Sequence, residues 1–131
     1  MGNTTDTNPT LHQLPGDLLA WGSQAVLDVA SERRRQIEEE GWTPDRDDEM
    51  HDDGEIASAA ASYALAAADV MRPYPQGDGG FEFEPPSMWL WGNKDWKPGN
   101  DPRRMLIKAG ALILAEIERI DRKNALNSTL R

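Results

Sequence analysis

The feature that most constrains the fold is an alanine-rich stretch in the middle of the chain. Eight alanines lie between Ala57 and Ala68, interrupted only by two serines, a tyrosine and a leucine. Because alanine has the highest helix propensity, this stretch predicts a helix over about 53–71, which Pro73 would end. Its small side chains would let another helix approach it closely.

Local end signals predict one further helix on each side of the alanine-rich one. Ser23 fits a helix N-cap, and Gly41 fits a C-terminal stop. Asp101 as an N-cap, with Pro102 at the first helical position, begins the last helix.

The sequence therefore predicts an all-α fold, a small helical bundle of three main helices with a long loop rich in tryptophan, proline and glycine. We expect loops over 41–50 and 72–101, with the aromatic side chains of the longer loop packed onto the bundle. In chain order, the expected parts are an irregular N-terminal arm over 1–16, a single helical domain over 17–123 with helices at about 23–40, 53–71 and 102–123, and a C-terminal tail over 124–131.

Apolar residues at helical spacing predict which faces are buried. On the first helix they are Val26, Val29, Ala30 and Ile37, opposite Asp28, Glu32, Arg35 and Glu39. On the last helix the expected core stripe is Leu106, Gly110, Ile113, Ile117 and Ile120. Since Ala111, Leu112 and Ala115 extend the apolar surface further around the last helix, we expect a homo-oligomer in which a partner subunit completes the bundle.

Composition excludes several classes of protein and site. A net charge of −9 opposes broad nucleic-acid binding, which depends on neutralising phosphates. No apolar run approaches the roughly 20 residues that span a bilayer, and the polar N-terminus lacks a secretory signal, so no membrane association and a cytoplasmic location are expected. With no cysteine, disulfides and thiolate metal sites are excluded.

Three carboxylates are candidate metal ligands. Glu32, Gln36 and Glu39 share one face of the first helix, and Glu55 lies near the start of the second. Oxygen ligands of this kind suit Mg²⁺, so Glu32, Glu39 and Glu55 form a possible magnesium site, the one cofactor expected. The alternative is a solvated helix face on which Glu32 contacts Arg35.

Basic residues near these carboxylates are candidate phosphate ligands. Arg33, Arg34 and Arg35 point about 100° apart around a helix, so only one or two, Arg34 and Arg35, would contact one phosphate. Lys108 could reach a phosphate from the last helix, or extend into solvent. Pairing of the arginines with neighbouring glutamates is the competing interpretation.

His51 and the tryptophans complete the candidate ligand site. His51 and Glu55 could bind a metal or act as acid and base, although Glu55 could instead cap the second helix by accepting from the backbone of Asp52. Trp42, and Trp96 next to Lys97, could stack on a nucleobase, or could simply anchor their loops. The expected ligand-binding residues are Arg34, Arg35, Gln36, Trp42, His51, Trp96, Lys97 and Lys108.

Two segments resemble a known family. ERRRQIEEEGWTPDRDDEMHDDGEIASAAASYALAA and WKPGNDPRRMLIKAGALILAEIERIDR, within residues 25–70 and 96–122, resemble bacteriophage accessory proteins related to the ead-like early phage proteins. More distantly, the helical layout is similar to the all-α MazG-type nucleotide pyrophosphohydrolases, which carry E-E-x-x-E and E-x-x-D metal motifs. Glu32, Gln36 and Glu39 occupy the first region without that spacing, and Ser58 stands where the second motif has aspartate.

The resemblance implies a phage protein acting in the cytoplasm of the infected bacterial host. The expected function is binding of a nucleotide-like ligand, such as a host immune signal that the phage sequesters. An alternative is a Mg²⁺-dependent pyrophosphohydrolase using Glu32, Glu39 and Glu55. A third is a protein-interaction module whose tryptophan-rich loop meets a host protein.

Overall fold

The computed structural model describes residues 22–72, 81 and 84–130, and in these residues the chain is helical, with no strand. The expected all-α class is therefore confirmed, while the arm over 1–16 lies outside the described residues. None of the described helices is both long enough and apolar enough to cross a membrane. The elements are α2 (Gln24–Glu38), α3 (Pro44–Met50), α4 (Glu55–Met71), the short 3-10 helix η2 (Asn93–Asp95) and α5 (Pro102–Leu130).

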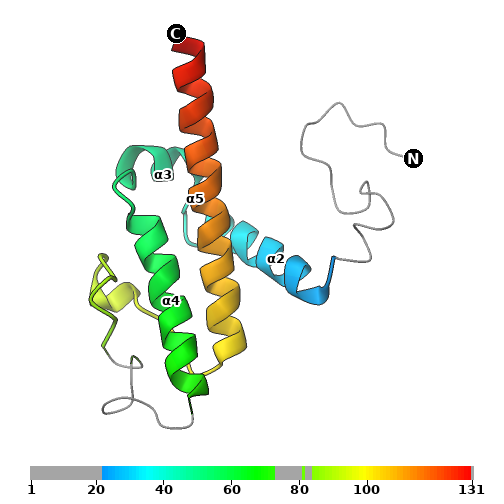
Figure 1. The fold of residues 1–131 in the computed structure, drawn as a ribbon, viewed down its shortest axis with the longest axis vertical. Helices are drawn as coiled ribbons and strands as arrows, with labels where there is room; N and C mark the ends of the chain where they lie inside the picture. The colour runs from blue at the N-terminus through cyan, green and yellow to red at the C-terminus, as the bar shows by residue number, and fades with distance from the viewer. Residues whose placement is uncertain (1–21, 73–80, 82–83, 131) are drawn as a thin grey trace.

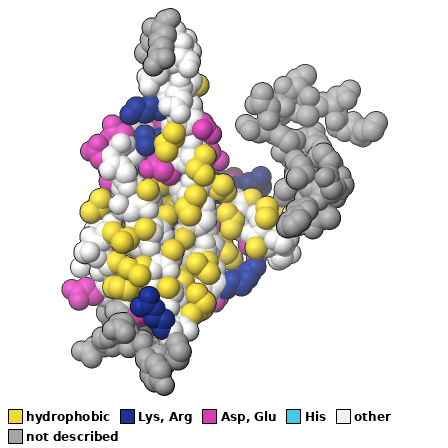
Figure 2. All heavy atoms as spheres, in the orientation of Figure 1, with side chains coloured by type: hydrophobic (Ala, Val, Ile, Leu, Met, Phe, Trp, Pro, Cys, Tyr) yellow, Lys and Arg dark blue, Asp and Glu magenta, His cyan; other side chains and the backbone are white. Residues whose placement is uncertain are grey.

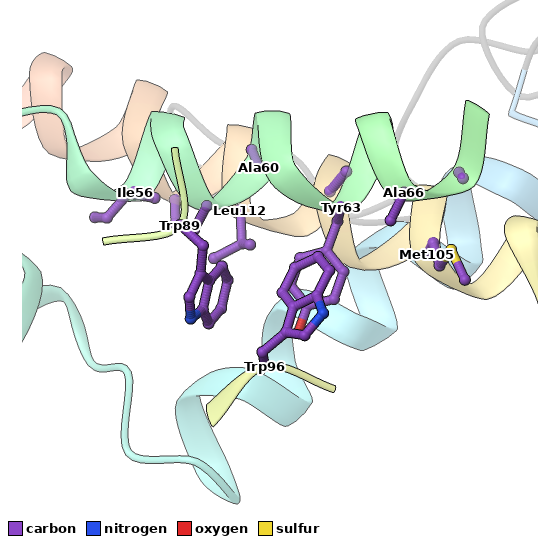
Figure 3. Close-up of a cluster of buried hydrophobic side chains, with 12 residues drawn as sticks. Ile56, Ala60, Tyr63, Ala66, Trp89, Trp96, Met105 and Leu112 are labelled. Atoms are coloured by element: carbon purple, nitrogen blue, oxygen red, sulfur yellow. The ribbon is translucent and has the colours of Figure 1, made fainter. Parts of the chain in front are cut away.

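The centre of the fold is the pairing of α4 with α5, which run side by side, while α2 crosses α5 at a steep angle (Figure 1). The alanines of α4 permit this close pairing, as predicted. Ala59, Ala60, Ala66 and Ala67 are each at most 3% exposed. These alanines pack against larger side chains of α5, such as Leu112, which fill the space that the small residues of α4 leave (Figure 3).

The tryptophan-rich loop packs onto α4 and completes the core, which confirms the expectation for its described part. The ring of Trp96 stacks on Tyr63 with centroids 4.8 Å apart, and Trp89 meets the same tyrosine edge-on at 5.6 Å (Figure 3). Trp96 donates its indole N–H to the carbonyl of Phe81 at 2.7 Å, so burial leaves no unpaired polar group on this ring. Tyr74 and Phe83 lie outside the described residues.

The buried face of α2 is only partly the one predicted, because Val29 and Ile37 are half-buried but the most buried residues are polar. Glu32, Arg33 and Gln36 are buried, whereas Val26 is 45% exposed and Leu27 is 40% exposed. The reason is that α5 supplies charged partners for the polar face, which therefore turns inward. Arg33, for example, donates to Glu118 of α5 at 3.1 Å.

The predicted core stripe of α5 is also wrong, because α5 turns a different side toward α4. Met105, Ala109, Leu112 and Ala115 are the buried residues on that side. Four members of the predicted stripe are 42–50% exposed: Leu106, Ile113, Ile117 and Ile120. On the face shown in Figure 2, hydrophobic side chains gather along α5 and continue onto α2. Only Gly110 is covered, by Val29 of α2.

Two segments expected to be irregular are helical. The predicted loop over 41–50 contains α3, because Thr43 caps it by accepting from the Arg46 N–H at 3.3 Å and Pro44 suits a first helical position. The C-terminal tail continues α5 as far as Leu130, since no glycine or proline follows Lys123 to end the helix. In Figure 1 this end of α5 extends beyond the other helices.

We expect Gly110→Leu to destabilise the fold, because even a Cβ at this position would lie 3.2 Å from a methyl carbon of Val29. Overpacking of this kind costs about 1–3 kcal/mol of unfolding free energy. Chemical denaturation followed by circular dichroism measures the change. The matched control is Ala125→Leu at an exposed position of α5, and an equal effect of both variants would contradict a tight α2–α5 crossing.

Candidate functional site

A cavity of about 520 Å³ opens where α2, α4, α5 and the tryptophan-rich loop meet. Every one of these elements contributes to its wall, and Arg46 of α3 lies at the same cavity. The lining residues are Glu32, Arg35, Gln36, Glu39, Glu40, Trp42, Arg46, His51, Tyr63, Trp91, Gly92, Asp95, Lys97 and Lys108. Charged, amide and aromatic side chains from both halves of the chain therefore converge on one space.

Most of the predicted site residues line this cavity, and three do not. Those that do are Glu32, Arg35, Gln36, Glu39, Trp42, His51, Lys97 and Lys108. Trp96 is only 7% exposed in the core, and Arg34 is exposed on α2 away from the lining set. Glu55 is also outside the lining set, so the structure does not bring Glu32, Glu39 and Glu55 together around this cavity.

Glu32 is the most strongly held group in the wall. It is 2% exposed, and it accepts from Arg35 at 2.8 and 2.9 Å and from Arg104 of α5 at 2.6 Å. Burial by itself would raise the pKa of Glu32, but the hydrogen bonds and charges of the two arginines outweigh it and hold that pKa below the ordinary value of 4.5. Glu32 is therefore ionised at neutral pH and accepts hydrogen bonds only.

Arg35 and Gln36 extend this network along the wall. Arg35 is shared among Glu32, Glu39 at 3.5 Å and Glu40 at 3.2 Å, as the competing interpretation of the arginines supposed. Gln36 is 2% exposed and donates its Nε2 to Glu32 at 3.3 Å. Its Oε1 has no hydrogen-bond partner within the part of the chain that the structure describes.

An aromatic wall faces the same cavity. Trp42 and Trp91 lie with ring centroids 5.5 Å apart, and His51 lies 5.1 Å from Trp91. Trp89 continues the contact into the core at 5.3 Å from Trp91. Because the wall rests on buried rings, its two tryptophans are held in place before any ligand arrives.

Lys108 and Tyr63 form the part of the wall contributed by α5 and α4. Lys108 donates to the carbonyl of Lys97 at 2.7 Å, and its ammonium lies 5.5 Å from the ring centroid of Tyr63. Burial lowers the pKa of Lys108, and the charge of Arg104 acts in the same direction. Burial also raises the pKa of Tyr63 to about 12, so its phenol is neutral at physiological pH.

Glu55 does not form the predicted capping box, because the N-cap of α4 is Gly54 and no side chain makes a cap hydrogen bond there. Its Oε1 accepts from the backbone N–H of Asp53 at 2.7 Å, one residue nearer than the predicted Asp52, and α4 begins at Glu55 itself. Its Oε2 lies 3.7 Å from Nδ1 of His51, beyond hydrogen-bonding distance. Within residues 22–72, 81 and 84–130, no group of three or more histidine, aspartate or glutamate side chains is placed to hold a metal ion.

Sequence reasoning missed several members of the wall. Tyr63 and Asp95 were not predicted to be site residues, nor was Arg104, which pairs with Glu32 from 72 residues away. One signal was available for Tyr63, because it is the single aromatic residue in an alanine-rich helix and must occupy space that its neighbours leave. Comparison with known protein families, curated proteins and solved structures gives no match to this chain.

We expect Glu32→Gln to destabilise the protein by about 1–3 kcal/mol at neutral pH, because it leaves Arg35 and Arg104 without their shared anion. Since the folded-state pKa of Glu32 is below 4.5, its contribution is fully present above that pH and is lost as the pH falls through the folded-state pKa. The difference in unfolding free energy between wild type and variant should therefore shrink in acid.

Urea denaturation at pH 7 and at pH 3 measures this difference. Glu38→Gln, at an exposed position of the same helix, is the control and should change stability little. A Glu32→Gln penalty that stayed the same at both pH values would contradict the ionised, arginine-paired carboxylate.

Proposed function

We propose that the cavity binds a nucleotide-like, phosphate-containing ligand and holds it without cleaving it. The observation that carries this proposal is the convergence of an aromatic wall and several cations on one space of about 520 Å³. That volume lies within the roughly 300–1,000 Å³ typical of small-molecule sites. Trp42 and Trp91 supply rings on which a base can stack, a contact of about 1–3 kcal/mol per base in single-stranded complexes.

The charges of the wall support a phosphate group near Lys97, Lys108 and Arg46. Arg35 already neutralises carboxylates of its own helix, so it stabilises the wall more than it would a ligand. Lys108 uses one N–H on the carbonyl of Lys97, and an ammonium has three donors. Arg46 and Lys97 are exposed and line the cavity, where they can turn toward a phosphate.

Binding is favoured over hydrolysis because the candidate metal ligands are used elsewhere. Glu32 accepts from two arginines and Gln36, and Glu55 lies outside the lining set and accepts from the backbone N–H of Asp53. The alternative is a Mg²⁺-dependent pyrophosphohydrolase that uses Glu39, the one other candidate metal ligand that lines the cavity. A protein-interaction role through the loop has less support, because Trp89 and Trp96 are 6% and 7% exposed.

The family resemblance extends the proposal to a biological role. A phage protein that retains a nucleotide intact would lower the concentration of that nucleotide in the infected cell. Sequestration of a host immune nucleotide signal is the role that we propose.

We expect Lys108→Met to weaken nucleotide binding by about tenfold or more, because it removes a cation from the phosphate side of the cavity. A thermal-shift screen of ribonucleotides and cyclic dinucleotides, with and without Mg²⁺, identifies a ligand, and isothermal titration then gives the dissociation constants. Ligand at 100 times its dissociation constant should stabilise the wild type by about 2.7 kcal/mol. Lys123→Met, exposed on the same helix, should bind as the wild type does.

The same samples separate binding from turnover. After incubation with Mg²⁺, denaturation followed by chromatography should return the nucleotide intact. Product that forms with the wild type but not with Glu39→Gln would instead establish the enzyme. No thermal shift with any nucleotide at 1 mM would reject both small-ligand functions.

We also propose that a second copy of the chain covers the exposed stripe of α5, formed by Leu106, Ile113, Ile117 and Ile120. Ile113, Ile117 and Ile120 follow one another at spacings of four and three residues, the repeat with which two helices pack along a seam. They lie beyond Gly110, which Val29 of α2 already covers. The end of α5 beyond the bundle is exposed from Lys123 to Thr129, so no side chain of the described chain buries this part of the helix. A symmetric pair of α5 helices would cover both the exposed stripe and the exposed end of the helix.

We expect the wild type to elute as a dimer and the double variant Ile113→Lys with Ile117→Lys to elute as a folded monomer, since both side chains are 50% exposed in one copy. Size-exclusion chromatography with light scattering gives the mass, and circular dichroism checks the fold. Ala57→Lys with Ala61→Lys adds the same charge to exposed positions of α4, outside the α5 stripe, as a control. A monomeric wild type at micromolar concentration would reject the dimer.

A further inference from the structure

We propose that the preferred ligand of this cavity is a nucleotide with a single phosphate group, which the charges of the wall select against nucleoside di- and triphosphates. This inference rests on the proposed nucleotide-binding function and names the ligand class of that same site. Its basis is the balance of charge around the cavity. The chain as a whole carries a net charge of −9, so it repels polyanions wherever local cations do not offset that charge.

The wall carries as many carboxylates as cations. The cations are Arg35, Arg46, Lys97 and Lys108, and the carboxylates are Glu32, Glu39, Glu40 and Asp95. With His51 counted as neutral, the wall therefore has no net formal charge. A site that binds a free triphosphate needs an excess of cations, or a metal ion that bridges the phosphates, to offset the charge of the ligand.

The part of the wall contributed by α2 has no positive charge left for a ligand. Arg35 is the cation that α2 adds to the lining, and it is paired with Glu32 at 2.8 Å and Glu40 at 3.2 Å. Glu39 lies 3.5 Å from the same guanidinium, and Arg104 of α5 adds a second cation at 2.6 Å from Glu32. Three carboxylates thus share two guanidinium groups, and this part of the wall repels any phosphate that extends toward it.

The cations available to a ligand are Lys97, Lys108 and Arg46. Lys108 donates to the backbone carbonyl of Lys97, a neutral acceptor, so its charge is not offset by that bond, and Arg46 and Lys97 are exposed. Three cations and the carboxylate of Asp95 leave a net charge of +2 on this part of the wall. A phosphate monoester carries about −1.5 to −2 charges at pH 7, which matches that value.

A second or third phosphate group finds no further cation in the wall. The charged lining groups that remain are Asp95 and the arginine-paired carboxylates of α2. Selection by repulsion of the larger anion is therefore built into the wall.

The test compares nucleotides that share a base and differ in phosphate number. Isothermal titration of the full chain uses the mono-, di- and triphosphates of adenosine, guanosine, cytidine and uridine at constant ionic strength without Mg²⁺. In each series that binds, we expect the monophosphate to bind about 10-fold more tightly than the triphosphate, with the diphosphate between them.

Adding Mg²⁺ separates the effect of charge from that of size. The ion binds the phosphates of the triphosphate and offsets two of their charges, so the affinity of the triphosphate should approach that of the monophosphate. The affinity of the monophosphate should change little. A triphosphate that stays about 10-fold weaker with Mg²⁺ would assign the selection to size and contradict the charge balance.

Asp95→Asn tests the wall itself. Removing this carboxylate should reduce the preference for the monophosphate by about threefold, because the third phosphate then meets one negative charge fewer. Glu84→Gln, exposed in the same loop and outside the lining set, is the matched control and should keep the full preference. An Asp95→Asn variant with the full preference would contradict the proposed selection.

The inference and the proposed function fail in different ways. Triphosphate binding without Mg²⁺ that equals or exceeds monophosphate binding would overturn the charge selection and leave the nucleotide site in place. If no nucleotide binds, the proposed function itself is rejected. The wild-type comparison needs no variant, so it decides the inference even if Asp95→Asn disturbs the fold, which circular dichroism would reveal.

Discussion

The buried carboxylate of Glu32 is the interaction on which the rest of this structure depends. Its bonds to Arg104 connect α2 to α5, and its bonds to Arg35 and Gln36 organise the neighbouring wall of the cavity. A buried carboxylate is destabilising unless its oxygens are paired, and here at least four hydrogen bonds meet it. Glu32 can therefore be buried because Arg104 of α5 pairs with it, while Val26 and Leu27 of the same helix stay exposed.

The helices themselves could be predicted from the sequence, because their signals are local. Ser23, the alanine-rich stretch and the Asp101–Pro102 pair each act within a turn or two of the chain, and the structure has helices at all three places. The missed helix α3 was also encoded locally, because Thr43 is its N-cap and Pro44 its first helical residue, although a proline can also mark the end of a helix. The same proline rule supports both interpretations, and only the acidic residues that follow favour the helix.

Burial could not be predicted in the same way, because it depends on contacts between distant residues. The inward face of α2 is set by Arg104 and Glu118, which lie 72 and 85 residues further along the chain from their partners. The spacing of hydrophobic residues along one helix carries no information about such pairs.

For the candidate site, too, local signals could be predicted and long-range packing could not. Helical spacing correctly predicted that Gln36 and Glu39 share a face, and both line the cavity. Arg34 points to another side of α2, and Trp96 is buried in the core.

The contacts that hold the parts of the cavity wall differ in their sensitivity to salt. α3 carries Arg46 at the cavity, and its attachment to α5 includes Asp48 and the carbonyl of Pro44, both held by Arg122. Asp48 and Arg122 are partly exposed, so salt screens their attraction, while the aromatic wall and the buried Glu32 network are sheltered from it. Raising the ionic strength should therefore weaken the Asp48–Arg122 attachment of α3, which carries Arg46, more than it weakens the pairing of Glu32.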